Sequence, residues 1–154
     1  MAKTYNQLEP VALTLDILGD RWTLLIIRDL LAGLSKFSTL TESLPGIPSN
    51  LLAERLKHLQ RNKIVDRIYY SEYPPRAEYL LTPRGQELAK IIAALADWGN
   101  KNALPKGEPK LDFVHSDCGA TLSLQLYCEK CEGEVATNVV ASRRDRRSRI
   151  ARAG

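Results

Sequence analysis

Hydrophobic positions of helical period alternate with turn-forming residues along the first hundred positions of the chain. Residues 11–18 carry such a pattern between Pro10 and Gly19, which suit the first turn and the end of a helix. A second helix is expected from about residue 22 to residue 31. Its polar face is nearly absent, so it should be buried on most sides.

Residues 37–60, FSTLTESLPGIPSNLLAERLKHLQ, contain two helical patterns separated by a stiff corner. Either Ser38 or Thr39 can cap the first helix. That helix should end at Leu44, because a residue that precedes proline avoids the α region. Gly46 can take the left-handed conformation that closes the turn. The two prolines and the glycine thus fix the angle between two short helices.

A longer helix is expected over residues 50–61, with Ser49 as its cap. Its buried stripe consists of four leucines, Leu51, Leu52, Leu56 and Leu59. The other side carries small and polar residues, Ser49, Asn50, Ala53, Glu54, Lys57 and His58. This pattern predicts a helix with a polar outer face behind a fixed corner.

The period then changes to two in residues 64–82, IVDRIYYSEYPPRAEYLLT. Alternation and aromatic enrichment predict a β-hairpin with Pro74 and Pro75 at its tip, where no ladder donor is needed. Thr82 and Pro83 should then start another helix, as N-cap and first residue. Its apolar stripe ends near Gly99 and consists of Leu88, Ile91, Ile92, Leu95 and Trp98.

This order predicts a mainly α winged helix-turn-helix domain with a small β-hairpin wing, over residues 8–99. A linker at residues 100–110, a small β module at residues 111–140 and a basic tail at residues 141–154 should follow. Ser49 and Asn50 would suit base edges and phosphates. Arg76 could reach a phosphate or a narrow minor groove, or instead pack on Tyr73.

Four linked segments carry a family resemblance: LDILGDRWTLLIIRDLLAG, KFSTLTESLPGIPSNLLAERLKHLQRNKIVDR, YPPRAEYLLTPRG and ALADWG. Together they resemble the HxlR-type winged helix-turn-helix transcriptional regulators over about residues 8–99. The resemblance implies a prokaryotic homodimer in which the helix after LPGI enters the major groove. It also implies that the first helix and the helix after the wing form the dimer contact, here Leu15, Trp22, Leu88, Ile92, Leu95 and Trp98.

Residue by residue, the resemblance implies DNA contacts from the reading helix, from the wing and from a basic position before the first helix of the motif. Arg55 can instead turn toward the adjacent helix. The implied contacts are Lys36, Ser49, Asn50, Ala53, Glu54, Lys57 and Arg76. Many members carry a cysteine in a CPV context before the first helix, and this chain has Glu9 there. A carboxylate cannot do thiol chemistry, so we expect no thiol sensing by that route.

His115, Cys118, Cys128 and Cys131 have the spacing H-x2-C-x9-C-x2-C. Such a set suits tetrahedral Zn²⁺ in a small ribbon. Between the two ligand pairs, the stretch TLSLQLY alternates polar and apolar residues, as the strands of a hairpin should. With four protein ligands the zinc would be structural. A metal-free hairpin with incidental thiols and a Cys128–Cys131 redox pair are the alternatives. Three cysteines argue against a disulfide framework.

The chain has 154 residues, 44% hydrophobic and 26% charged, which suits one compact domain with an appendage. Residues 143–154 hold six arginines and one aspartate, a net charge of +5. Since the whole chain has a net charge of +4, residues 1–142 carry a net charge of −1. This tail is expected to be disordered; it can attract phosphates or be a solvated end without a special role. No apolar stretch of membrane-spanning length and no secretory pattern is seen, so we expect a cytoplasmic protein without membrane contacts.

No base and nucleophile are placed together, and no phosphate-binding glycine loop is present, so an enzyme is not expected. The predicted function is a repressor or activator that binds double-stranded DNA as a homodimer on a near-palindromic operator. The alternative is a protein-interaction adaptor that uses the zinc-ribbon-like module and has a degenerate winged domain, which the acidic Glu54 favours. Steep loss of DNA affinity with salt would indicate the regulator.

Overall fold

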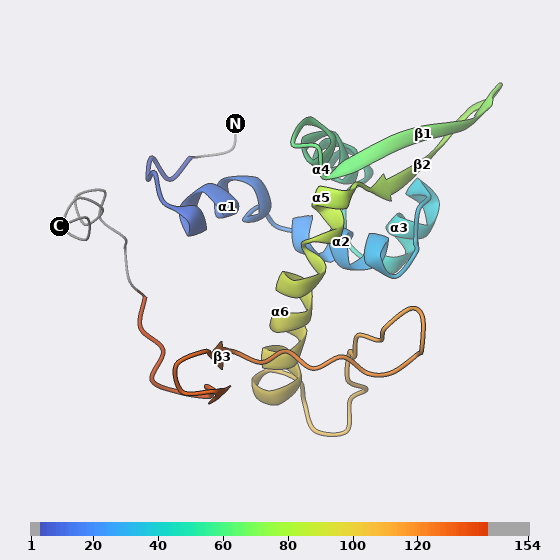
Figure 1. Ribbon diagram of the computed structural model, residues 1–154. Coiled ribbons are helices and arrows are strands. Elements are labelled where there is room, and N and C mark those ends of the chain that lie inside the picture. The colour runs from blue at the N-terminus through green and yellow to red at the C-terminus, as the bar shows by residue number, and fades with distance from the viewer. Residues whose placement is uncertain (1–3, 142–154) are drawn as a thin grey trace. The chain divides into compact units, whose positions relative to one another are not determined.

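The computed structural model describes residues 4–141 of the chain (Figure 1). The chain divides into two compact units, with the boundary between Phe113 and Val114. Within the described residues, no helix is long and apolar enough to cross a membrane. The predicted basic tail lies almost entirely outside the described residues.

Both helices predicted at the start of the chain are present. The first, α1 (Pro10–Leu18), begins with proline and is capped by Glu9, whose carboxylate accepts hydrogen bonds from the backbone N–H groups of Val11 and Ala12. The second, α2 (Thr23–Leu31), begins one residue later than expected. Trp22 has a φ of 79° and precedes the helix in a left-handed conformation.

The corner and its two helices are also present, but they are capped differently. In α3 (Phe37–Ser43) the N-cap is Lys36, and the hydroxyl of Thr39 donates to the Lys36 carbonyl (2.9 Å) instead of capping an N–H. The prediction of Ser38 or Thr39 as cap was therefore wrong. Ser49 is the first residue of α4 (Ser49–Arg61), and Pro48 is the N-cap without a side-chain bond. Gly46 has a φ of 90°, as its turn requires.

The wing is an antiparallel hairpin of β1 (Val65–Glu72) and β2 (Pro75–Leu81), as predicted. Its register shifts between Tyr69 and Ser71, so Tyr70 sits in a β-bulge. An isolated bridge between Lys36 and Glu78 ties the start of α3 to β2. Figure 1 shows the hairpin extending beyond the helices, with its base beside α4.

The helix predicted after the wing is divided into α5 (Pro83–Gln86) and α6 (Ala89–Asn102). Thr82 is the N-cap as predicted: its hydroxyl accepts from the Gly85 N–H (3.1 Å) and donates to the Lys63 carbonyl (2.7 Å). The expected end near Gly99 was too early, because the glycine stays helical. The Asn102 side chain donates to the Trp98 carbonyl (2.9 Å) in the last turn.

The core of the first unit lies between α2, α3, α4 and the base of the wing. Apolar side chains from all these elements are almost fully buried there. Leu51, predicted in the buried stripe of α4, is half-buried. The fully enclosed side chains include Ile26, Ile27, Leu40, Leu44, Leu52, Leu56, Leu59 and Val65.

Gly85 packs so closely that no side chain fits. A Cβ there would lie 2.2 Å from the Ile64 carbonyl oxygen and 3.0 Å from Leu81 Cδ2. Gly85→Ala should therefore lower the free energy of unfolding by about 3 kcal/mol, the upper range for overpacking. The matched control is Gly99→Ala, where a Cβ would meet nothing within 4 Å. Chemical denaturation of both variants checks this, and equal stability of the two would contradict the packing.

In the second unit, β3 (Tyr127–Cys128) and β4 (Gly133–Glu134) form a short antiparallel pair. Val114 and Thr121 form an isolated bridge. The strands predicted across TLSLQLY were mostly wrong, because only Thr121 and Tyr127 at its two ends take part in pairing. The alternating leucines of this stretch are exposed, so no sheet face is buried that would fix a strand register.

Candidate nucleic-acid interface

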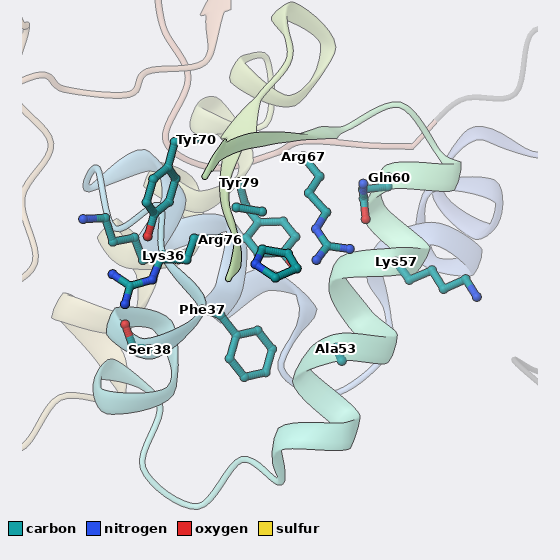
Figure 2. Close-up of a pocket in the computed structure, with 12 residues that line it drawn as sticks. Lys36, Phe37, Ser38, Ala53, Lys57, Gln60, Arg67, Tyr70, Arg76 and Tyr79 are labelled. Carbon is teal, nitrogen blue, oxygen red and sulfur yellow. The ribbon is translucent and has the colours of Figure 1, made fainter. Parts of the chain in front are cut away.

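An open groove of about 930 Å³ runs between α4, the start of α3 and the wing (Figure 2). Ala53, Lys57 and Gln60 lie on the α4 side, spaced so that they share one helical face. The other side is formed by α3 and the two strands. The residues that complete the groove are Lys36, Phe37, Ser38, Arg67, Tyr70, Pro75, Arg76, Ala77 and Tyr79.

Four cationic side chains line this groove, and no carboxylate does: Lys36, Lys57, Arg67 and Arg76. None of the four forms an ion pair with an acidic side chain of the described residues. All four are exposed. Their summed field therefore attracts an anion that can follow the groove.

Aromatic rings hold two of these cations in place. The Lys36 Nζ atom lies 5.6 Å from the ring centroid of Tyr70. The Arg67 Cζ atom lies 4.8 Å from the Tyr69 centroid and 5.8 Å from that of Tyr79. Such contacts orient a cation but leave its N–H groups free to donate. Figure 2 shows the Arg67 guanidinium pointing between the wing and α4.

The predicted DNA contacts divide into two groups in space. Lys36, Ala53, Lys57 and Arg76 line the groove. The others lie on the exposed surface of the first turns of α4 and outside the groove lining, namely Ser49, Asn50 and Glu54.

Arg67 was missed from the sequence. Strand alternation placed Arg67 on the other face of the strand from Ile68 and Tyr70. Alternation alone does not say which of the two faces meets α4. The pairing of Arg67 with the buried Tyr79 across the hairpin gives this information, since Tyr79 contributes to the core. The signal that could have indicated it is an arginine directly opposite an aromatic residue of the hairpin, because cross-strand partners lie on the same face.

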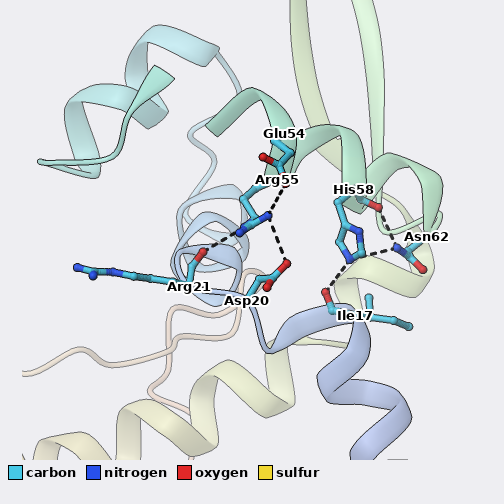
Figure 3. Close-up of polar contacts among 7 residues, drawn as sticks. All are labelled: Ile17, Asp20, Arg21, Glu54, Arg55, His58 and Asn62. Carbon is cyan, nitrogen blue, oxygen red and sulfur yellow. Dashed lines mark hydrogen bonds and ion pairs between the residues drawn. The ribbon is translucent and has the colours of Figure 1, made fainter. Parts of the chain in front are cut away.

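A polar brace fixes α4 against the end of α1 and the following turn (Figure 3). The Arg55 guanidinium lies 3.3 Å from Asp20 Oδ2, and its Nε donates to the Arg21 carbonyl (3.3 Å). Arg55 therefore turns toward the adjacent helix, the option that the sequence left open. It also pairs with Glu54 (3.1 Å). The brace holds the side of α4 opposite the groove.

His58 belongs to this brace and not to the outer face of α4, where the sequence pattern placed it. Its Nε2 lies 3.0 Å from the Ile17 carbonyl oxygen, and the Asn62 amide lies 3.4 Å from the same nitrogen. The ring is half-buried against α1. The error arose because a short α1 approaches α4 from a side that helical periodicity alone cannot assign.

The residues predicted for a dimer contact do not all reach the surface. Leu15, Leu95 and Trp98 are 40%, 51% and 63% exposed. Ile92 is 4% exposed and belongs to the chain's own core, while Trp22 and Leu88 are half-buried against it. Three further large apolar residues of α1 and α6 are exposed and were not in the prediction, namely Val11, Leu13 and Ile91.

Glu9 stands where many members of the family carry a cysteine, and its role in the structure is to cap α1.

The cysteines of the chain all lie in the second unit, and all three are free thiols. Backbone and side-chain hydrogen bonds from Cys131, with a further backbone bond from Lys130, lower the pKa of the Cys128 thiol. His115 Nδ1 lies 3.3 Å from Cys118 Sγ. Across residues 4–141, no group of three or more potential ligands lies together as a metal site.

The comparisons with known proteins agree with this geometry. The model of the HxlR-like helix-turn-helix family matches residues 17–107. An uncharacterized HTH-type transcriptional regulator of Mycobacterium tuberculosis, Rv3095, is 38% identical over 133 residues, covering 86% of this chain and 83% of the relative. YodB of Bacillus subtilis, an HTH-type transcriptional regulator, is 38% identical over 89 residues, covering 58% and 80%.

Among solved structures, that of PA1607, which is described as a transcription factor, covers 91% of this chain and 97% of its own. The two share 30% sequence identity with a TM-score of 0.77. The match thus extends past the winged domain. The cationic groove, the helix-turn-helix corner and the family match lead to one conclusion: this chain belongs to the HxlR-like helix-turn-helix family.

Proposed function

We propose that this protein is a cytoplasmic DNA-binding transcriptional regulator that acts as a homodimer on a near-palindromic operator. The observation that carries the proposal is the groove beside α4, where four cations lack acidic partners within the described chain. A helix with an exposed polar face next to such a groove has the two features that DNA reading requires, base contact and phosphate contact. An adaptor with a degenerate winged domain would have no use for the unpaired cations.

In this proposal the first turn of α4 reads the bases. Ser49 and Asn50 are exposed there, and no side chain caps the free backbone N–H groups of the helix start. An asparagine amide can bond both the N6 and N7 positions of adenine, and Glu54 one turn later could accept from a cytosine amine. Free N–H groups at a helix start also favour a phosphate.

The groove would hold the DNA backbone. Lys57 extends from α4, while Arg67 and Arg76 come from the wing (Figure 2). The sugar-phosphate backbone of one DNA strand would lie between them and be contacted from both sides. These contacts would not depend on the base sequence. The brace of Arg55 and His58 keeps α4 at a fixed angle while its opposite side meets the DNA.

The homodimer part of the proposal rests on exposed apolar side chains of α1 and α6. Val11, Leu15, Leu95 and Trp98 are each 40% or more exposed. Large apolar groups gathered on two helices mark an interaction surface. A two-fold pairing there would present two α4 helices to half-sites about 34–36 Å apart.

Asn50→Ala should reduce the discrimination between DNA sequences. Loss of one bidentate base contact costs about 1–3 kcal/mol for the preferred base, roughly ten- to hundredfold. Selection of binding sites from random duplexes, done for wild type and variant, measures this as relaxed preference at one position of each half-site. An unchanged selected sequence would show that the first turn of α4 does not read bases.

The matched control is Arg76→Ala, in the wing. It should weaken binding to all sequences about equally and leave the selected motif as it is in wild type. If the arginine variant relaxed the motif and the asparagine variant did not, the assignment of base and phosphate contacts would be reversed.

A further inference from the structure

The second unit repeats one small hairpin twice, with an offset of 13 residues. In the first hairpin Val114 pairs with Thr121. In the second, Tyr127 pairs with Glu134, and the offset relates both partners. Each hairpin therefore closes the same number of residues. The potential metal ligands occupy equivalent places, since His115 and Cys128 directly follow the first paired residue.

The turns of the two hairpins also match. The second ligand of each pair is Cys118 or Cys131, and a residue with positive φ follows it directly: Gly119 at 71° and Glu132 at 51°. A left-handed residue at this position turns the chain so that both side chains of a pair point to the same side. The repetition of pairing, ligand spacing and turn indicates two equivalent ligand-bearing knuckles.

The first knuckle already has its two ligand atoms close together. Zn–S and Zn–N bonds of about 2.3 and 2.0 Å with tetrahedral angles place the two ligand atoms about 3.5 Å apart. His115 Nδ1 and Cys118 Sγ are separated by 3.3 Å. The second knuckle shares the strand pairing, the ligand spacing and the positive-φ turn of the first, so we expect its two sulfur atoms to lie at a similar separation.

The second unit lacks a core that could hold it together. None of residues 114–141 is buried. Leu122, Leu124 and Leu126 are 55%, 44% and 61% exposed. A module of this size without a hydrophobic core needs a cross-link, either a disulfide or a metal. An odd number of cysteines, joined with a histidine in an equivalent position, fits a metal better than a disulfide.

We propose that the two knuckles close on one Zn²⁺ ion through His115, Cys118, Cys128 and Cys131. The two pairs do not lie together as one site in the described residues, so binding of the ion would bring the knuckles together. The three thiols release their protons on binding, and the histidine binds as neutral imidazole. Four protein ligands fill the tetrahedron, so the site is structural.

Native mass spectrometry of the full chain, purified without chelator, tests the stoichiometry. We expect one zinc per chain. Replacement by Co²⁺ should give the visible absorption of a tetrahedral ion with thiolate charge-transfer bands. A metal-free chain, or one whose mass shows a Cys128–Cys131 disulfide, would overturn the proposal.

Two pairs of substitutions test the ligand set. Cys128→Ser with Cys131→Ser and, separately, His115→Ala with Cys118→Ser should each abolish stoichiometric zinc and the cobalt spectrum. Asp117→Asn is the control, because this carboxylate lies 3.7 Å from His115 Nε2 but is outside the ligand set; it should keep the metal. Zinc that survives the His115 and Cys118 change would mean that the two cysteines of one knuckle bind it alone, and would contradict a four-ligand site.

The same variants separate this proposal from DNA binding. Loss of zinc should increase protease cleavage within residues 114–141 and leave the thermal unfolding of the winged domain unchanged. Stoichiometric zinc in a protein that binds no DNA would leave the metal site standing and refute only the regulatory function. Equal cleavage with and without metal would show that the ion does not cross-link the knuckles.

Discussion

Replacing Leu95 and Trp98 of α6 by aspartate should convert the protein from a dimer to a monomer and remove most of its DNA affinity. Both side chains are more than half exposed in the single chain, so the changes leave the core intact. At a two-fold interface each aspartate would be buried without a partner, which costs several kcal/mol. Loss of the second half-site should then lower operator affinity by about 100-fold or more.

Sedimentation or light scattering gives the mass, and titration with operator DNA gives the affinity. The matched control is Leu126→Asp, since this leucine is 61% exposed and lies in the second unit. It should keep both the dimer mass and the affinity. If the double variant stayed dimeric, the interface would lie elsewhere, and if it became monomeric with unchanged affinity, the two-half-site mechanism would be wrong.

The second large effect is expected on DNA affinity and its salt dependence when three cations of the groove are removed together. The triple variant carries Lys57→Ala, Arg67→Ala and Arg76→Ala. Each phosphate contact contributes about 0.9 to the slope of log affinity against log salt. A dimer would lose up to six such contacts, so its slope should become less steep by about 5. Affinity should fall most at low salt, and the order of preference among sequences should persist.

A control with the same loss of charge separates the groove from the overall charge. Arg84→Ala, Lys106→Ala and Lys110→Ala remove three exposed cations that do not line the groove. This variant should keep the wild-type salt slope almost unchanged. Equal effects of both triple variants would indicate that net charge, and not the groove, determines the affinity.

The winged fold could be predicted from the sequence because its elements differ in local period. Helical spacing in residues 37–60 and alternation in residues 64–82 are properties of neighbouring residues. The corner could be predicted because Pro45 and Gly46 restrict the backbone directly. The break between α5 and α6 could not, because the Thr82–Pro83 start and the apolar stripe that follows fit one continuous helix as well as two.

Caps and side-chain directions were less predictable because they depend on the path of the chain. Ser49 has the right chemistry for an N-cap, yet the helix begins one residue earlier than a serine cap requires. His58 has a polar side chain in a polar stripe, yet it points toward the Ile17 carbonyl oxygen. Arg67 was missed for a related reason, since the bulge at Tyr70 and the position of α4 decide which wing face is used.

Titration of wild-type protein with its selected operator and with a scrambled duplex, each over a series of salt concentrations, tests the central proposal most directly. We expect tight binding to the operator, weaker binding to the scrambled duplex, and a steep fall of both affinities as salt rises. Weak binding with little salt dependence and no difference between the two duplexes would contradict DNA recognition by α4 and the cationic groove.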